Sequence, residues 1–210
     1  MLLREIAGPA GRLEALLDDP AAGGQTLRAA VVFAHPHPQH GGTMHTKVVY
    51  QGAKAFSRIG CSVLRFNFRG VGTRAGFFDD GVGEAAHFQA ALEFMHERHP
   101  SAPLWACGFS FGAWIASTVG AADPRVSTLV GIAPPLARYD FESVRLSTKP
   151  KFFIQGERDE LCPLKHMHEF YARCVEPKEL VVIDAADHLF DGKTSEVGDA
   201  VEDLLGDWEG

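Results

Sequence analysis

The alternation of short apolar runs with segments of helical periodicity is the feature that most restricts the fold of this 210-residue chain. Ala29–Ala34 is apolar without interruption, as expected for a strand that is buried on both faces of a sheet. Thr43–Ile59 instead places its apolar residues at helical spacing. The two kinds of segment alternate about once in every thirty residues, the length of a right-handed βαβ unit. This rhythm predicts an α/β protein with a mainly parallel, twisted sheet and helices on both faces.

The other expected elements follow the same rhythm. Leu2–Ile6 and Arg12–Leu17 are expected to form a hairpin that adds an antiparallel edge to the sheet. We expect about eight strands in one domain that spans residues 1–210, because this length suits a single domain. The further strands are expected at Ala29–Ala34, Ser62–Phe68, Pro103–Cys107, Ser127–Ile132, Pro150–Ile154 and Leu180–Ile183. The helices are expected at Thr43–Ile59, Gly81–His99, Phe111–Gly120, Pro163–Cys174 and a C-terminal stretch with Val197, Val201, Leu204, Leu205 and Trp208 on its apolar side.

Charge and cysteine content restrict the class of partner and the compartment. The net charge of −7 argues against binding to nucleic acid, which requires clustered Lys and Arg. The four cysteines form no Cys-x-x-Cys pair, which is typical of reduced, buried thiols. Neither a signal peptide nor an apolar stretch of membrane-spanning length is visible. We therefore expect a soluble, cytoplasmic protein without membrane or nucleic-acid partners, for which a homodimer is possible.

A G-x-S-x-G motif lies where an expected strand passes into an expected helix. Ligands of a parallel sheet bind at the carboxyl ends of its strands, and Gly108–Gly112 follows such an end. The motif is typical of a sharp turn that lifts the serine out of the sheet and leaves it at a helix N-terminus, where N–H groups face negative charge. A purely structural glycine-rich turn is the alternative, and the strand and helix around the motif make it less favoured. Ser110 is therefore the candidate nucleophile.

Two later strand ends carry a candidate base and a candidate acid. A serine hydroxyl needs a base, and the base needs an orienting group. His188 follows the last expected strand and Asp159 follows the strand before it, in the chain order serine, acid, histidine. Glu157 and Glu160 are expected to be solvated surface residues. Asp187 is discounted as the orienting acid because side chains of adjacent residues rarely point at each other.

The loop after Ala29–Ala34 reads His-Pro-His-Pro and is expected to supply a backbone N–H to an oxyanion hole. Pro36 and Pro38 have no N–H, so His37 is the best donor in the loop. The other donor is expected to be Phe111, the residue after the candidate nucleophile. A metal site is the competing interpretation of this segment, since His35, His37, His40 and His45 are close in sequence. No zinc spacing fits them, and we expect no metal.

Together these motifs resemble a small α/β-hydrolase. The resemblance covers nearly the whole chain. Within this fold family, the sequence is similar to the group without a cap domain that lies near the dienelactone hydrolases and short-chain esterases. The resemblance rests on His35–Pro38, Asn67–Gly72, Gly108–Gly112, Gly156–Asp159 and Asp187-His188. The resemblance implies a Ser110–Asp159–His188 triad, an oxyanion hole made by the N–H groups of His37 and Phe111, and no cofactor. Dienelactone hydrolases have Cys in place of Ser110, and haloalkane dehalogenases require Asp there, so neither specificity is expected.

The segment Pro134–Pro150 is too short for a cap domain, so the site is expected to be open. We expect a carboxylesterase that acts on a small-molecule substrate with a small or medium acyl group. If His188 is the base, activity should rise with pH through about 6 to 7, near the value of an unperturbed histidine. The pocket walls are expected to include His35, Phe77, Phe78, Phe109, Leu136, Tyr139, Leu161 and Leu189.

Three questions stay open at the level of sequence. The same residues would serve a thioesterase or a small-peptide or amide hydrolase. A non-catalytic binding protein can also keep this fold, because fold does not imply function. Arg69 is expected to brace loops through backbone carbonyls, and binding of an acidic substrate is its alternative role.

Overall fold

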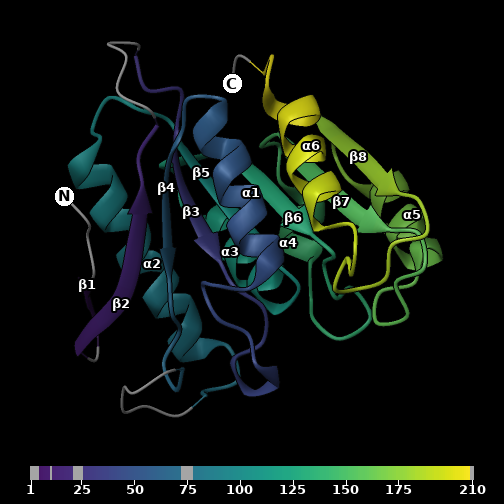
Figure 1. Ribbon diagram of the computed structural model, residues 1–210, viewed down its shortest axis with the longest axis horizontal. Coiled ribbons are helices and arrows are strands. Elements are labelled where there is room, and N and C mark those ends of the chain that lie inside the picture. Colours follow the sequence, from purple (N-terminus) through teal and green to yellow (C-terminus); the bar gives the residue numbers. More distant parts are fainter. Residues whose placement is uncertain (1–4, 10, 21–25, 72–77, 209–210) are drawn as a thin grey trace.

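The computed structural model describes residues 5–9, 11–20, 26–71 and 78–208. Its described residues contain an eight-stranded sheet with the strand order β1-β2-β4-β3-β5-β6-β7-β8 (Figure 1). The strands are β1 Glu5–Gly8, β2 Gly11–Asp18, β3 Ala30–Ala34, β4 Ser62–Phe66, β5 Leu104–Phe109, β6 Val126–Ile132, β7 Lys151–Gly156 and β8 Lys178–Ile183. The helices are α1 Lys47–Arg58, α2 Val82–Arg98, α3 Phe111–Ala122, α4 Glu142–Leu146, α5 Leu164–Arg173 and α6 Thr194–Leu205, with a 3₁₀ turn η1 at Pro38–His40.

The pairing of the strands confirms a mainly parallel sheet with an antiparallel edge. Strands β4, β3, β5, β6, β7 and β8 run parallel to one another, and the β1–β2 hairpin joins β4 in antiparallel register. The chain passes from β3 to β4 on one side and then crosses over through α2 to β5 on the other side of β3. This reversal places a topological switch point between the carboxyl ends of β3 and β5, where such sheets bind their ligands.

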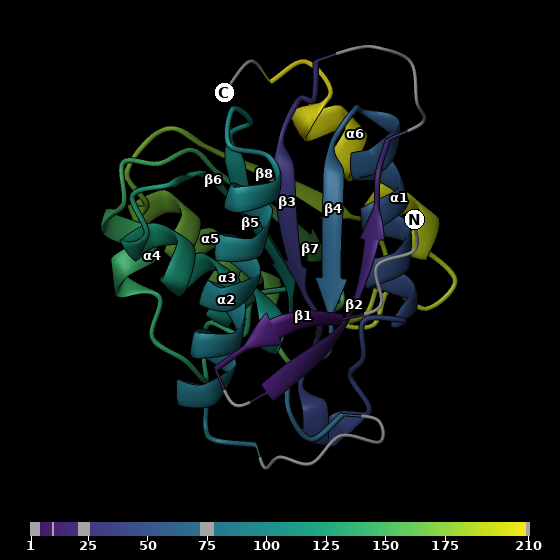
Figure 2. The same ribbon diagram turned by 90° about the vertical axis from the view of Figure 1, so that its left-hand side faces the viewer.

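Helices cover both faces of the sheet, which explains why the strand segments are apolar throughout. Helices α1 and α6 lie side by side on one face, and α2, α3, α4 and α5 lie on the other (Figure 2). All five residues of β3 are buried. Val31 and Phe33 pack into the core under α1 and α6, whereas Val32 and Ala34 pack into the opposite core. A strand between two cores has no polar face, as the uninterrupted run predicts.

The ends of several elements differ from the sequence-based expectation. Helix α1 begins at Lys47 instead of Thr43, because the Thr46 N–H donates to the Thr43 carbonyl at 3.0 Å and closes a turn first. Strand β4 ends at Phe66, two residues early. Helix α6 ends at Leu205, and Trp208 lies beyond it but still packs on Phe152 with ring centroids 5.3 Å apart. Helix α4 and the η1 turn were not expected. The expected strand at residues 2–6 lies partly outside the described residues.

The segment between β6 and β7 holds only the five-residue helix α4, so there is no cap domain between these strands. Over the described part of the chain, no helix has the length and apolar character needed to cross a membrane.

Candidate active site

Ser110 occupies the single residue between β5 and α3. Its backbone has φ 55° and ψ −121°, a region that residues other than glycine rarely adopt. The Ser110 N–H donates to the Ile132 carbonyl at 2.8 Å, and the Ser110 carbonyl accepts from the Ala113 N–H at 2.8 Å. Strand β6 and the first turn of α3 therefore hold the strained turn in place.

The two glycines of the motif are required by close backbone approach. A Cβ atom at Gly108 would lie 2.0 Å from the carbonyl oxygen of Gly112, and one at Gly112 would lie 2.4 Å from the carbonyl oxygen of Ala34. Both distances are shorter than any tolerated contact. The glycines thus let α3 begin directly against the end of β3, which brings Ser110 to the switch point.

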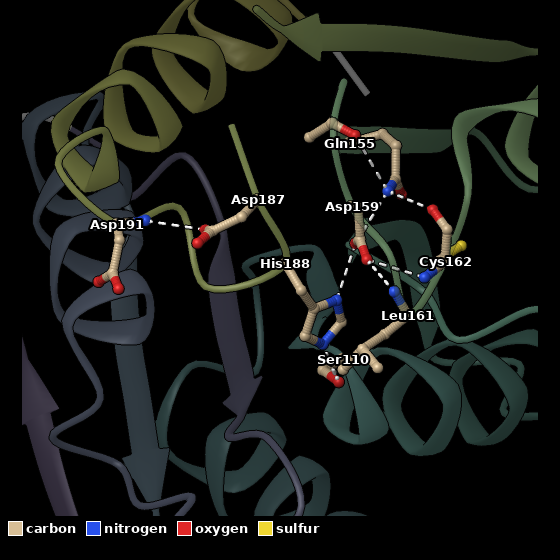
Figure 3. Close-up of polar contacts among 9 residues, drawn as sticks. Ser110, Gln155, Asp159, Leu161, Cys162, Asp187, His188 and Asp191 are labelled. Atoms are coloured by element: carbon tan, nitrogen blue, oxygen red, sulfur yellow. Dashed lines mark hydrogen bonds and ion pairs between the residues drawn. The ribbon is translucent and has the colours of Figure 1, made fainter. Parts of the chain in front are cut away.

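Ser110, His188 and Asp159 form a row of hydrogen bonds across three strand ends (Figure 3). The Ser110 Oγ lies 2.8 Å from His188 Nε2, and His188 Nδ1 lies 2.7 Å from Asp159 Oδ2. Because the carboxylate can only accept, these partners assign the ring proton to Nδ1 and leave the Nε2 lone pair facing the serine hydroxyl. The sequence order predicted these three residues, and the fold brings them together from β5, β7 and β8.

The Asp159 carboxylate is buried, with 3% of the residue exposed, and is held from several sides. Its Oδ1 accepts from the N–H groups of Leu161 at 2.9 Å and Cys162 at 2.8 Å, and its Oδ2 accepts from Gln155 Nε2 at 3.0 Å (Figure 3). These contacts fix the carboxylate in the direction of His188. Sequence analysis missed Gln155, although a polar residue near the end of a buried apolar strand was a visible signal.

The other acidic residues near His188 do not reach its ring. Asp187 points away from it and accepts from the Asp191 N–H at 3.0 Å (Figure 3). Glu157 is exposed and accepts from the Ala185 N–H at 2.7 Å. Glu160 is exposed as well.

The loop after β3 folds tightly against the nucleophile turn. The His37 carbonyl accepts from the N–H groups of His40 and Gly42, both at 3.1 Å, and the His37 ring lies 5.0 Å from the Phe111 ring between centroids. Partial burial lowers the pKa of His37, and the charges of His40 and Arg138 lower it further, although Asp80 acts in the opposite direction.

A small hollow of about 50 Å³ opens over Ser110. Leu161 and Tyr139 line it, as expected from the sequence. His40, Pro135 and Arg138 also line it and were missed, although two of them follow the end of β6 and could have been found by the same strand-end rule. The full lining among the described residues is His37, His40, Ser110, Phe111, Pro135, Arg138, Tyr139, Leu161 and His188.

The expectation that His35 lines the pocket is wrong. His35 is fully buried, its Nδ1 lies 2.6 Å from the Pro36 carbonyl oxygen, and its Nε2 accepts from the Phe68 N–H at 3.0 Å. Burial lowers its pKa to about 4, so the ring is neutral. His35 therefore ties the loop after β3 to the loop after β4, and its side chain does not face substrate.

Three other expected wall residues lie elsewhere. Phe109 is fully buried beneath the His188 ring, with centroids 5.7 Å apart. Leu136 lines a neighbouring cleft of about 340 Å³ that shares Tyr139 with the hollow. Leu189 is 55% exposed and does not line the hollow.

The remaining expectations concern the loop after β4. Phe78 packs on the rings of His37 and Phe111, so it supports the wall from behind. Arg69 was expected to bind backbone carbonyls, but among the described residues its guanidinium lies against His87, with Nη2 3.4 Å from Nε2. Phe77 and Gly72 lie outside the described residues.

The histidines of the loop after β3 do not converge. His35 turns inward to Phe68, while the rings of His37 and His40 stack with centroids 4.5 Å apart. Within residues 5–9, 11–20, 26–71 and 78–208, no three His, Cys, Asp or Glu side chains come together in a way that could hold a metal ion.

Comparison with known proteins agrees with this architecture. The model of the family described as serine aminopeptidase, S33, matches residues 25–144. An uncharacterized protein of Rickettsia prowazekii is 35% identical over 207 residues, which cover 94% of this chain and 86% of that protein. An alpha-beta serine hydrolase homologue from Coxiella burnetii is 36% identical, with a TM-score of 0.89 over 96% of this chain and 95% of that one.

A serine hydrolase without a lid from Xanthomonas campestris is 33% identical, with a TM-score of 0.88 over 97% of this chain and 92% of that one. The family match, the identity over nearly the full length and the uncapped sheet agree with one another. The chain belongs to the serine hydrolase family described as serine aminopeptidase, S33, and is a small, lidless α/β-hydrolase.

Proposed function

We propose that this protein is a carboxylic ester hydrolase with Ser110 as nucleophile, His188 as general base and Asp159 as the residue that orients the base. The row of hydrogen bonds from Ser110 Oγ through His188 to Asp159 is the observation that carries the proposal. His188 Nε2 takes the hydroxyl proton while Oγ attacks the acyl carbon, and the same proton then goes to the leaving oxygen. Water, deprotonated by His188, afterwards releases the acid from the acyl-enzyme.

The developing oxyanion is assigned to two backbone N–H groups. Phe111 is the first residue of α3, so its N–H has no acceptor within the helix. His37 lines the same hollow, and its neighbours Pro36 and Pro38 have no N–H to offer. Each such donor is worth about 3 kcal/mol of transition-state stabilisation.

The size of the hollow favours a small acyl group. A volume of about 50 Å³ is far below the roughly 300–1,000 Å³ of a typical ligand pocket. It can enclose the reacting carbonyl and a short acyl chain, while the rest of a substrate lies across the open mouth. Acetyl and butyryl esters are therefore expected to react faster than long-chain esters.

The family description makes an aminopeptidase the second candidate. Such an enzyme must hold the free ammonium group of its substrate, for which a carboxylate is the usual partner. The described residues that line the hollow include no Asp or Glu, and Arg138 there would repel an ammonium group. The charge at the mouth thus favours esters or thioesters over peptides with a free N-terminus.

The experiment combines labelling with turnover. Wild type, Ser110→Ala and Ser127→Ala are treated with a fluorophosphonate probe and assayed on p-nitrophenyl acetate, butyrate and decanoate, and on alanyl p-nitroanilide. Ser127 is a matched control because it lies near the start of β6, at the end of the strand that faces away from the site. Labelling and ester turnover that disappear only in Ser110→Ala support the proposal. A folded wild type that neither labels nor hydrolyses any of these substrates would show a non-catalytic protein.

A further inference from the structure

We propose that the natural substrate carries a carboxylate, which the guanidinium group of Arg138 holds at the mouth of the hollow over Ser110. The inference rests on the proposed ester hydrolysis and narrows its substrate class to acyl compounds with a free acid group. The carboxylate can belong to the acyl part or to the leaving group, and the experiment below separates the two.

Arg138 lies in the tight turn that follows β6. Its N–H donates to the Pro135 carbonyl at 3.0 Å, and the Tyr139 N–H donates to the same carbonyl at 3.3 Å. Arg138, Pro135 and Tyr139 all line the hollow together with Ser110. The turn therefore fixes the backbone of Arg138 beside the candidate nucleophile, on a loop of the scaffold that also forms the pocket wall.

The side chain of Arg138 has no bonded partner among the residues that the structure describes. Arg138 is exposed and forms no hydrogen bond or ion pair through its side chain with any described residue. Two other arginines by contrast bind carboxylates: Arg125 binds Asp123 at 2.7 Å, and Arg145 binds Glu142. An unpaired guanidinium at the edge of a reactive hollow is a ready partner for a planar anion, which it can bind through two parallel hydrogen bonds.

The described lining of the hollow offers no negative charge that would repel an anion. It contains Arg138 and three histidines but no carboxylate. Burial and the charge of His40 lower the pKa of His37, and the charge of Arg138 lowers it further; His37 lines the same hollow. Asp80 acts on His37 and Tyr139 in the opposite sense, but it forms no ion pair with Arg138.

The small volume of the hollow makes a charged anchor valuable. About 50 Å³ can enclose only a few carbon atoms, so little apolar surface is buried on binding. The wall beside Arg138 is supported from behind, because the Tyr139 ring stacks on Trp114 with centroids 4.2 Å apart. A substrate that is recognised by burial alone would have little to hold it, whereas one with a carboxylate gains a charge-assisted contact on a fixed wall.

The experiment uses two pairs of esters that differ only in charge. Monomethyl succinate and methyl 4-oxopentanoate have nearly the same shape, and only the first carries a carboxylate, on its acyl part. Acetoxyacetate and acetoxyacetone form the corresponding pair for the leaving group. Acid release at constant pH gives kcat and KM for each ester. We expect the anion of at least one pair to react with a kcat/KM about tenfold higher than that of its neutral partner.

Three variants test whether Arg138 causes this preference. Arg138→Gln should reduce the ratio of kcat/KM for the anion to kcat/KM for its neutral partner to about one. The change should come mainly through KM, because a contact far from the reacting atoms stabilises bound substrate and transition state alike. Arg138→Lys should keep part of the preference. Arg98→Gln is the matched control. It removes the same charge from the last residue of α2, which precedes β5 and so lies at the amino-terminal ends of the parallel strands, away from the site. This variant should keep the preference of wild type. Added salt at about 0.5 M should weaken the preference of wild type.

The outcomes separate this inference from the proposed function. Hydrolysis of the neutral esters without preference for either anion, or a preference that survives in Arg138→Gln, overturns the role of Arg138 and leaves ester hydrolysis intact. If no ester is hydrolysed at all, the role of Arg138 is tested by measuring how tightly the esters bind. Calorimetry on Ser110→Ala should then show tighter binding of monomethyl succinate than of methyl 4-oxopentanoate, and this difference should be lost when Arg138→Gln is added. Equal binding of the anion and its neutral partner, both in this pair and in the acetoxyacetate–acetoxyacetone pair, also overturns the inference.

Discussion

Two buried histidines follow the carboxyl ends of parallel strands, and their ring contacts differ in kind. His35 follows β3 and binds two backbone groups, the Pro36 carbonyl and the Phe68 N–H. His188 follows β8 and contacts two side chains, the carboxylate of Asp159 and the hydroxyl of Ser110. Backbone groups do not exchange protons with a ring near neutral pH, whereas a serine hydroxyl next to a free Nε2 can. The partners of a histidine, and not its place after a strand, therefore separate a structural role from a chemical one.

The comparison is sharpest for His188→Ala, for which we expect the largest effect. Loss of the base should lower kcat for p-nitrophenyl acetate by about a millionfold, as in other enzymes whose triad acts as a unit. The free energy of unfolding should change by at most about 2 kcal/mol, because Asp159 keeps three N–H donors from Gln155, Leu161 and Cys162. Ester turnover and urea denaturation measure the two quantities. A variant that keeps a tenth of the activity would contradict the role of His188.

The next largest effect is expected from Asp159→Asn. The amide can donate to His188 Nδ1, which would leave the ring proton on Nε2, facing the serine hydroxyl. We expect kcat to fall about ten-thousandfold, the loss known for the corresponding change in another triad. Asp187→Asn is the matched control, since Asp187 is adjacent to His188 but binds the Asp191 N–H instead. Equal losses in the two variants would mean that Asp159 does not orient the base.

For the other histidine of the comparison, His35→Phe should affect stability more than chemistry. Phenylalanine keeps an aromatic ring against Phe68 but leaves the buried Phe68 N–H and the Pro36 carbonyl without partners. Two unsatisfied groups should lower the free energy of unfolding by about 2–5 kcal/mol. Urea denaturation gives this value, and kcat of the folded variant should stay within about tenfold of wild type. A loss below about 1 kcal/mol would show that His35 does not tie the two loops together.

The sequence allowed prediction of the parts of the molecule that depend on local pattern. Strands such as β3 are apolar throughout because they lie between two cores, and the order of Ser110, Asp159 and His188 follows from the order of the strand ends. The glycines of the motif were predictable as well, since the turn requires close approach wherever it occurs. These features follow from residue type and spacing alone.

Features that depend on contacts between distant loops were not predictable. His35 turns inward because its Nε2 accepts from the N–H of Phe68, which lies 33 residues later in the chain. The pocket wall depends on how the turn at Pro135–Tyr139 folds back over Ser110. Gln155 reaches Asp159 because the chain doubles back after β7. In each case residue identity was visible, but the partner was set by tertiary structure.

The last and smallest expected effect concerns stability in acid, and it is expected for His35 and for a further buried histidine, His87. Burial lowers the pKa of His35 to about 4, and burial beside Arg69 lowers that of His87 to about 4 as well. In the unfolded chain both rings take up protons near pH 6.5, so between about pH 6.5 and 4 the unfolded state binds more protons than the folded one. The contribution of the two neutral rings to the free energy of unfolding is therefore fully present above about pH 6.5, and it is lost as the pH drops toward about 4.

At about pH 5 each ring should contribute a loss of about 2 kcal/mol relative to neutral pH. Urea denaturation of wild type, His35→Phe and His87→Phe at about pH 7.5 and pH 5 tests this. Each variant should lose about 2 kcal/mol less on acidification than wild type does, because it lacks one ring that must stay neutral in the fold. If His35→Phe is as acid-sensitive as wild type, the folded protein accepts a proton at His35. The bond from the Phe68 N–H to a neutral Nε2 would then be wrong, and with it the structural half of the comparison with His188.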